Sequence, residues 1–258
     1  MSEQEKKLLI PRRTLLGGIA ASAGLALTGC DRLNESEGFR SILRGAESLN
    51  MASQRLITSR TALAREYSES DMSPVFRMNG TIGPASDEYN AHRAEGFASW
   101  KLKVDGLVAK PMQLSLAQLM AMPAREQITR HDCVEGWSAI GKWRGTPLGI
   151  VLKAAGLSAR ARYIVFHCAD FFGEDPYYES IDLIDAFHPQ TILAWGMNGG
   201  MLPVGHGAPL RLRVERQLGY KHAKYVMRIE ATDSLADIGR GKGGYWEDEI
   251  DYEWYAGI

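Results

Sequence analysis

Strand and helix signals follow one another irregularly along this chain, and this order limits its possible folds more than any other feature. Residues 100–104 and 210–215 alternate apolar and polar side chains, which predicts strands with one wet or ligand-facing side. Residues 163–166 and 225–231 indicate two further strands. Because helices do not regularly separate successive strands, a doubly wound parallel sheet is excluded. We therefore expect an α+β fold, with mixed sheets and short helices in a single domain.

Short helices are expected where a capping residue precedes an apolar run. Residues 115–122 begin with Ser115 as the predicted N-cap. Residues 146–156 begin with Thr146 as the predicted N-cap and end at Gly156. These signals predict two separate helices of two to three turns.

The segments before the first strand are harder to assign. Residues 39–66 predict one helix within a polar stretch, and residues 76–98 hold so much Gly, Pro and Asn that we expect an irregular loop. Asp105-Gly106 directly follows the first strand, which predicts a hairpin turn.

The first 29 residues have the features of an export signal. Arg12 and Arg13 stand directly before residues 15–27, an uncharged run of apolar and small side chains. This run is too short for a membrane-spanning helix, which needs roughly 20 residues. The pair of arginines is the twin-arginine arrangement. Because that route carries folded proteins, the signal favours a cofactor-containing enzyme that is exported to the periplasm.

The apolar run ends in a sequence that resembles a bacterial lipoprotein cleavage box, Leu-Thr-Gly followed by Cys30. In such proteins the cysteine is lipidated, and an Asp such as Asp31 often favours retention at the inner membrane. Cleavage after Ala23 is the alternative, and it would leave Cys30 in an unmodified tail. We expect the lipid to hold the protein at the inner membrane.

The composition sets the remaining limits. Lys and Arg number 30 against 31 Asp and Glu, so the formal net charge is −1 and no nucleic-acid partner is expected. Hydrophobic residues make up 45%, which suffices for one sizeable core. We expect a signal over residues 1–29, a polar tether and helix over 30–75, and a catalytic domain over 76–258.

The catalytic domain is expected to end in an aromatic and acidic arm. In residues 245–255, five aromatic side chains and several carboxylates stand together. We expect the rings to pack on the domain and the carboxylates to lie in water. A cation site or a docking patch for a cytochrome is the alternative.

The densest cluster of reactive side chains centres on Cys133. Arg130, His131 and Asp132 precede it directly, and nearby positive charge favours a thiolate. The thiol could be a nucleophile paired with His131, a zinc ligand, or a soft ligand for a redox metal. A disulfide with Cys168 and an incidental cysteine in a surface turn are the structural alternatives.

Four segments in one order carry a resemblance to a known family. They are CVEGWS at 133–138 with GTPL at 145–148, HPQTIL at 188–193, GHGAPLR at 205–211, and GYKHAK at 219–224. Together they resemble the molybdenum-binding segments of the sulfite oxidase family. The similarity is greatest to its bacterial, haem-free branch, which includes periplasmic sulfoxide-reducing enzymes.

The resemblance implies one molybdenum–molybdopterin cofactor per chain, with Cys133 as the thiolate ligand of the metal. Arg211 and Lys224 suit the pterin phosphate, because a buried phosphate needs a guanidinium or an ammonium group. The other cofactor contacts that the resemblance implies are Asn79, Cys168, His206, His222 and Ala223. The catalytic residues that we expect are Cys133, Arg130, Asp132 and Arg77.

The resemblance also implies an activity and partners. We expect two-electron oxygen-atom transfer on a small or protein-bound sulfur compound, such as a methionine-sulfoxide-like substrate. Because the chain has no haem segment, electrons are expected to pass to or from a membrane cytochrome. The enzyme is expected to be a monomer.

Two alternatives come from other classes of protein. One is a cofactor-free cysteine or zinc hydrolase built on Cys133, His131, Asp132 and His167. The other is a non-catalytic lipoprotein that keeps the fold as a binding module. Elemental analysis separates them, because the three hypotheses predict molybdenum, zinc and neither metal.

Overall fold

The computed structural model describes residues 36–258, so the predicted signal and Cys30 lie outside the described residues. Residues 54–258 form one compact unit, and the chain before them belongs to a second unit. Helix α2 (Glu37–Ile57) crosses this boundary. Among the described residues, no helix combines the length and the hydropathy that a membrane span requires.

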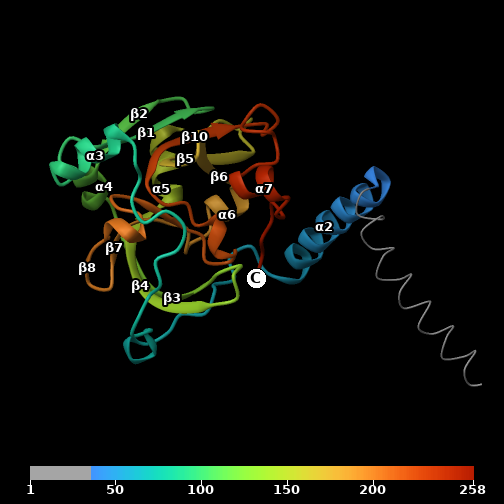
Figure 1. The fold of residues 1–258 in the computed structure, drawn as a ribbon, viewed down its shortest axis with the longest axis horizontal. Helices are drawn as coiled ribbons and strands as arrows, with labels where there is room; N and C mark the ends of the chain where they lie inside the picture. The colour runs from blue at the N-terminus through green and yellow to red at the C-terminus, as the bar shows by residue number, and fades with distance from the viewer. Residues whose placement is uncertain (1–35) are drawn as a thin grey trace, which may run out of the picture. The chain divides into compact units, whose positions relative to one another are not determined.

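Five strands form the first sheet of the compact unit. Its order is β2-β1-β10-β5-β6, in which β1 and β10 run parallel and the other neighbours run antiparallel. Figure 1 shows this sheet in the upper half of the unit. The strands are β1 (Lys101–Gly106), β2 (Met112–Ser115), β5 (Tyr163–Phe172), β6 (Asp175–Asp182) and β10 (Val226–Thr232).

The second sheet lies in the lower half of the unit in Figure 1. Its order is β3-β4-β7-β8, and β9 also pairs with β7. All of its pairings are antiparallel. The strands are β3 (Arg125–Asp132), β4 (Ser138–Pro147), β7 (Ile192–Met197), β8 (Gly200–Met201) and β9 (Arg211–Arg213).

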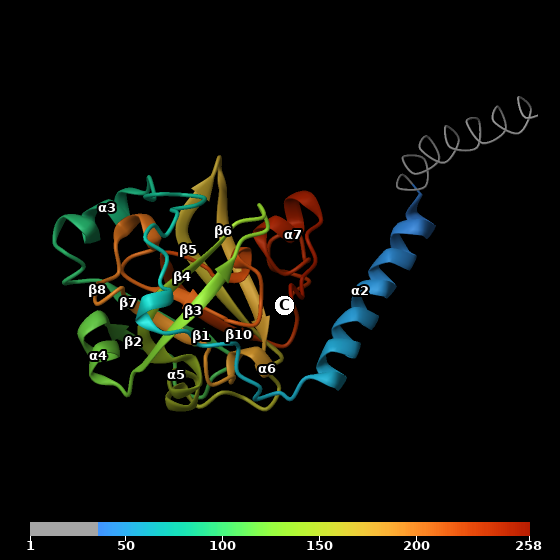
Figure 2. The ribbon, with the colours of Figure 1, turned by 90° about the horizontal axis from the view of Figure 1, so that it is seen from below.

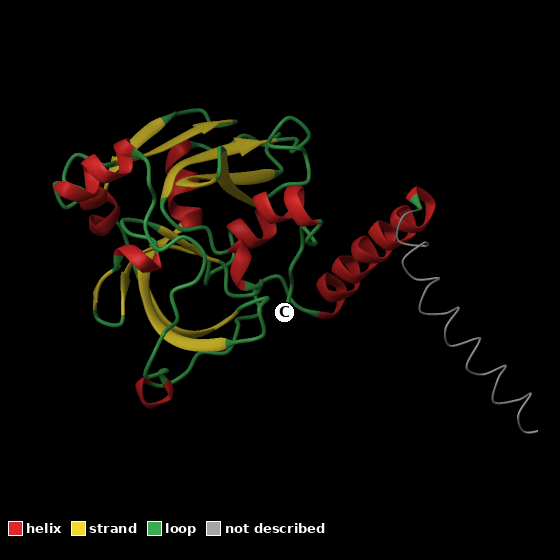
Figure 3. Ribbon diagram, in the orientation of Figure 1, coloured by secondary structure: helices red, strands yellow, loops and turns green. Residues whose placement is uncertain are grey.

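Short helices stand between and beside the strands rather than forming a regular layer, as the colours of Figure 3 show. The mixed α+β fold predicted from the sequence is therefore confirmed. The α-helices are α3 (Asp87–Ala94), α4 (Leu116–Ala121), α5 (Leu148–Ala155), α6 (Leu183–Ala186) and α7 (Tyr245–Ile250). The 3₁₀ helices are η1 (Glu69–Asp71), η2 (Val204–His206) and η3 (Gly219–Lys221).

The two predicted capped helices are present, and one cap differs. Ser115 caps α4 as predicted, because its hydroxyl accepts a hydrogen bond from the Gln118 amide at 3.2 Å. Helix α5 starts one residue later than predicted, with Pro147 at the N-cap position. The hydroxyl of Thr146 instead donates to the Leu119 carbonyl at 2.8 Å, so a tertiary contact replaces the expected local one.

The segments before β1 differ from the prediction. Helix α2 ends at Ile57 instead of continuing to residue 66, because the residues beyond it hydrogen-bond to distant segments: the Ala64 amide to the Gln190 side chain at 2.7 Å and the Tyr67 amide to the Ile128 carbonyl at 2.9 Å. The expected loop over 76–98 contains α3, whose N-cap is Ser86. Gly-rich and Pro-rich sequence on its N-terminal side conceals this short helix.

Two strand predictions need correction in their details. Asp105 and Gly106 are not a hairpin turn but the end of β1, where they pair with Glu230 and Ala231 of β10. The chain turns after them and returns as β2. Strand β9 has no wet side, because all three of its residues are buried.

The main core lies around the first sheet. Trp100, Phe166 and Leu152 are fully buried in it, with residues from strands of both sheets. A smaller core around Trp143 lies at the second sheet. Because both cores are closely packed, the loops that leave the strands start from fixed points.

Candidate active site

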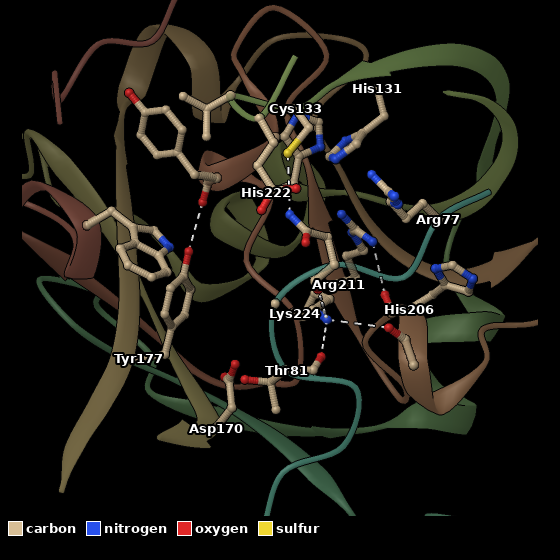
Figure 4. Close-up of a pocket in the computed structure, with 18 of the residues that line it drawn as sticks. Arg77, Thr81, His131, Cys133, Asp170, Tyr177, His206, Arg211, His222 and Lys224 are labelled. Atoms are coloured by element: carbon tan, nitrogen blue, oxygen red, sulfur yellow. Dashed lines mark hydrogen bonds between the residues drawn. The ribbon is translucent and has the colours of Figure 1, made fainter. Parts of the chain in front are cut away.

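Loops from both sheets surround one pocket with a volume of about 290 Å³. Its wall contains residues from the β3–β4 turn, the segment before α3, η2, β9, η3 and the segment that follows α7. In the view of Figure 4, Cys133 and two histidines lie toward one end, and Lys224 and Asp170 lie toward the other. The lining includes the expected residues Arg77, Asn79, Cys133, His206, Arg211, His222 and Lys224.

Cys133 lies in a tight turn that aims its thiol at the pocket. The Cys133 amide donates to the Trp137 carbonyl at 2.9 Å, and the Gly136 amide donates to the Cys133 carbonyl at 3.0 Å. Gly136 has a φ of 86°, a conformation that favours glycine. The turn therefore needs the glycine of the CVEGWS segment, and it fixes the direction of the Cys133 side chain.

The Cys133 sulfur accepts a hydrogen bond from the Asn79 side-chain amide at 3.3 Å. Burial raises the pKa of the thiol, while this hydrogen bond and the Arg77 charge oppose the rise. The free thiol is therefore protonated at neutral pH. A bound metal ion would replace that proton, because the thiolate is the form that ligates metals.

Lys224 fixes the loop that carries Asn79. Its ammonium group donates to the carbonyls of Asn79 at 2.8 Å, of Thr81, and of Gly205 at 3.3 Å. Burial and the charge of Arg211 lower the pKa of Lys224 to about 7. Asn79 thus links two parts of the pocket, with its amide on Cys133 and its carbonyl on Lys224.

Arg211 is a buried cation with few partners. Its Nη1 donates to the His206 carbonyl at 3.1 Å, and its guanidinium lies 5.2 Å from the centre of the Trp143 ring. Its Nε is buried without a hydrogen-bond partner. Burial and the neighbouring Arg213 lower its pKa from 12.5 to about 9. Arg211 therefore lacks an anionic partner among the described residues that would fully offset its burial.

The polar groups of the pocket fit an anionic, sulfur-ligated cofactor. The Arg211 Nε donor and the His222 Nδ1 acceptor are both buried without partners, and His222 lines the pocket beside the Cys133 turn. The positive charges of Arg211 and Lys224 suit a phosphate, and a single thiol suits a soft metal ion. The ligand-facing interpretation of β9 is thus supported at Arg211.

Two further groups of the pocket have pKa values shifted by burial. Burial, with the charges of Arg211 and Lys224, lowers the pKa of His206 to about 4, so this ring is neutral at pH 7. Burial raises the pKa of Asp170 to about 6, against the opposing effect of hydrogen bonds and of Lys224. Asp170 is therefore the carboxyl group of the pocket that is best able to hold a proton near neutral pH.

Four of the expected residues do not line the pocket. Arg130 and Asp132 form an ion pair at 2.9 Å on the outer face of β3, because alternate residues of a strand point to opposite sides. Cys168 is buried in β5, where its nearest polar partner is the Phe166 carbonyl at 3.8 Å. Ala223 is buried beside the pocket, and its carbonyl accepts from the Leu212 amide.

The alternatives built on the cysteines are not supported. Cys133 and Cys168 are free, so they form no disulfide. His167 contacts Glu230 at 2.8 Å and does not line the pocket with Cys133. Within residues 36–258, no three His, Cys, Asp or Glu side chains gather in a way that could hold a metal ion. The structure therefore does not bring His167 together with Cys133, as the hydrolase alternative requires.

The sequence interpretation missed the aromatic wall of the pocket. Phe172 and Tyr177 come from the first sheet, and Trp246 and Tyr252 come from the C-terminal arm. Phe172 stacks on Tyr245 of this arm with ring centres 4.9 Å apart. Only the density of aromatic residues in the tail pointed toward this role.

The carboxylates of the arm were expected in water; Asp251 and Glu253 are exposed, but Glu247 and Asp248 are buried. Glu247 is buried against Lys221, which also contacts Glu179 at 2.6 Å. Asp248 is buried too, and it accepts from the amides of Arg240 and Lys242. These contacts hold α7 beside β6, as Figures 1 and 2 both show. The buried acids therefore fix the arm that carries Trp246.

Residues 90–237 match the family model described as the oxidoreductase molybdopterin binding domain. The chain belongs to this family of enzymes, the molybdopterin-binding oxidoreductases related to sulfite oxidase. The resemblance found in the four sequence segments is therefore confirmed. The hydrolase and the non-catalytic module are set aside.

Curated relatives give more detail. A protein of Azospira oryzae, described as a candidate protein-methionine-sulfoxide reductase subunit and named YedZ1, is 37% identical over 98% of this chain and 87% of its own length. The protein-methionine-sulfoxide reductase catalytic subunit MsrP of Xanthomonas axonopodis is 30% identical over 88% of this chain and 71% of its own length. MsrP of Xanthomonas campestris is 36% identical over 59% of this chain, which matches about half (51%) of that relative.

One solved structure shows a more distant likeness. The sulfane dehydrogenase SoxCD of Paracoccus pantotrophus matches 53% of this chain and 39% of its own chain, at 23% identity and a TM-score of 0.48. A likeness of this size says nothing about the reaction.

Proposed function

We propose that this molybdopterin-binding oxidoreductase reduces a methionine-sulfoxide-like substrate by two-electron oxygen-atom transfer. The relatives described as methionine sulfoxide reductases support the substrate class and the direction of transfer. The observation that carries the proposal is the buried Cys133 thiol, which faces a pocket with two cations that lack full anionic partners.

The residues of the pocket divide the work of holding the cofactor. Cys133 ligates the metal, and Asn79 orients its sulfur by the hydrogen bond at 3.3 Å. Arg211 and Lys224 bind the phosphate of the pterin, and one cofactor binds per chain. When bound, such a cofactor exchanges two electrons and one oxygen atom with a substrate.

Other residues of the pocket bind the substrate and supply a proton. Phe172, Trp246 and Tyr252 line the pocket, and the carbon and sulfur atoms of a methionine side chain pack well on aromatic rings. Reduction of a sulfoxide to a thioether consumes two protons and releases water. Asp170, with a pKa of about 6, supplies one of these protons.

The cellular setting is part of the proposal and is supported by the sequence alone. The twin-arginine segment supports export of the folded enzyme to the periplasm, and the box at Cys30 supports an anchor in the inner membrane. A membrane cytochrome would then deliver the two electrons. The enzyme acts as a monomer in this scheme.

The test compares the two buried cysteines of the described chain. Cys133→Ser should keep much of its pterin, because the cations that bind the phosphate remain. It should lose reduction of methionine sulfoxide with a reduced viologen dye, and it should lose the thiolate-to-metal absorption band. Cys168→Ala is the matched comparison, and it should keep both, since its thiol lies away from the pocket.

Molybdenum and pterin content, measured on the same samples, show whether each variant is loaded. Full sulfoxide reduction by Cys133→Ser would sink the thiolate assignment. A loaded parent enzyme that reduces no sulfoxide but oxidises sulfite would sink the proposed substrate class.

A further inference from the structure

His131 lines the pocket, and the resemblance to the family assigned it no role. The groups around its ring determine which of the two ring nitrogens carries a proton. It lies on the buried face of β3, two residues before Cys133, together with Gln127 and Thr129. Arg213 of β9 donates from Nη1 to His131 Nδ1 at 2.9 Å. A guanidinium can only donate, so Nδ1 must be the acceptor and must carry no proton. The ring proton is therefore on Nε2.

Arg213 is held rigidly in this position. Its Nε and Nη2 donate to the two carboxylate oxygens of Glu215 at 2.8 and 2.6 Å. Glu215 also accepts from Gln127 Nε2 at 2.8 Å, and the guanidinium lies 4.3 Å from the centre of the Trp143 ring. Because the ion pair is fully buried and bidentate, the donor to His131 has one orientation.

The opposite edge of the His131 ring faces the pocket. A Cβ atom placed on Gly219, another pocket residue, would lie 2.6 Å from His131 Nε2. Only a glycine at this position leaves space beside the nitrogen. Among the described residues, no acceptor receives the Nε2 proton. His131 therefore offers a donor to the space between the Cys133 turn and Gly219.

His222 offers the opposite function beside it. Its Nε2 must donate to the Gln217 carbonyl at 3.0 Å, so its Nδ1 carries a lone pair. That Nδ1 is buried without a partner. The two rings are 5.0 Å apart and nearly perpendicular. The pocket thus presents one fixed donor and one fixed acceptor next to each other.

We propose that His131 binds the molybdopterin cofactor by donating a hydrogen bond from Nε2 to an acceptor atom of that cofactor. Arg213 and Glu215 are positioning residues that hold the ring in the required tautomer, and His222 accepts from a donor of the same group. The inference rests on the cofactor of the proposed function and is independent of its sulfoxide substrate.

Two substitutions of His131 test the donor. In His131→Gln the amide oxygen can accept from Arg213 while the amide nitrogen donates to the pocket, so cofactor content should stay within about twofold of the parent enzyme. His131→Met fills a similar volume without a donor. It should lose cofactor roughly tenfold more readily, which is the effect of one hydrogen bond. Molybdenum and pterin per folded chain are measured after dialysis.

The tautomer is measured directly by nitrogen NMR of the purified holoenzyme labelled at histidine, with the Gln variant identifying the His131 signals. A protonated Nε2 and a bare Nδ1 are expected. In the double variant Arg213→Met/Glu215→Leu, which removes both charges together, the signals should show a mixture of the two tautomers. This change would not follow from a merely structural role for the pair.

Two results would overturn the inference. One is a proton on His131 Nδ1 in the parent enzyme, which decides the matter even if a variant fails to fold. The other is a His131→Met enzyme that keeps its cofactor as well as the parent. An enzyme that shows the expected tautomer and loading but reduces no sulfoxide would refute the proposed substrate and leave this inference intact.

Discussion

Replacing Arg211 by methionine should have opposite effects on the cofactor-free and the cofactor-loaded protein. The pKa of Arg211 falls from 12.5 to about 9, chiefly by burial. At 1.36 kcal/mol per pH unit, holding the cation costs roughly 5 kcal/mol relative to its neutral form. Methionine fills most of the same volume and carries no charge. The cofactor-free protein should therefore gain stability when Arg211 is replaced.

Two favourable contacts reduce this gain. Arg211→Met loses the hydrogen bond to the His206 carbonyl, worth about 1.5–3 kcal/mol, and the contact with the Trp143 ring, worth about 1 kcal/mol. The net gain in unfolding free energy of the cofactor-free protein is then about 1–2.5 kcal/mol. The loaded protein should lose its cofactor at least tenfold more readily, because the phosphate loses a charge-assisted hydrogen bond.

The assay is urea unfolding of protein from a host unable to make molybdopterin, followed by tryptophan fluorescence. Cofactor content is measured in parallel on protein from a competent host. Arg144→Met is the matched control, since Arg144 also lies over a tryptophan, at 5.1 Å from the Trp195 ring, but is exposed. The control should change stability by about 0.5 kcal/mol or less. An Arg211→Met protein that is less stable than the control when cofactor-free, and that keeps its cofactor, would refute the reasoning.

Three further predictions concern pH and export. The pKa of Asp170 is raised from 3.8 to about 6 in the folded chain, so between pH 4 and 6 the folded state holds a proton that the unfolded state has released. The unfolding free energy of the cofactor-free protein should fall as pH rises through this window. Asp170→Asn should remove up to roughly 3 kcal/mol of that fall in urea titrations, and an unchanged pH profile would contradict the assignment. Cys30→Ser should release the mature protein from the membrane fraction, whereas continued sedimentation with membranes would indicate docking to another protein. Arg12→Lys with Arg13→Lys should leave the precursor in the cytoplasm on cell fractionation, and normal export would exclude the twin-arginine route.

The sequence predicted those parts of the site that depend on local pattern or on the order of segments. The CVEGWS segment places Cys133 in the pocket because its glycine makes a tight turn immediately after the cysteine. The GHGAPLR and GYKHAK segments bring Arg211 and Lys224 together, as the resemblance implied. Arg130 and Asp132 were assigned to the site by their closeness to Cys133, although strand alternation turns them to the outer face.

The other differences come from contacts between distant residues. Strand β1 pairs with β10, more than a hundred residues away, and no local pattern shows that partner. Thr146 carries a good capping side chain, yet its hydroxyl donates a hydrogen bond to the Leu119 carbonyl. Glu247 was expected in water, but it is buried in an ion pair with Lys221. In each case a tertiary partner decides what the local sequence leaves open.

The span of the pocket along the chain has a consequence for when the enzyme can be assembled. Its wall starts at Phe76 and is completed only by Trp246 and Tyr252. At roughly 5–20 residues per second, a ribosome needs on the order of 10–35 seconds to make the chain between Phe76 and Tyr252. Until Tyr252 has been made, Cys133 and Arg211 have no finished pocket around them. Cofactor insertion must therefore follow synthesis of this span, so the protein needs a waiting step between translation and any departure from the compartment where the cofactor is made.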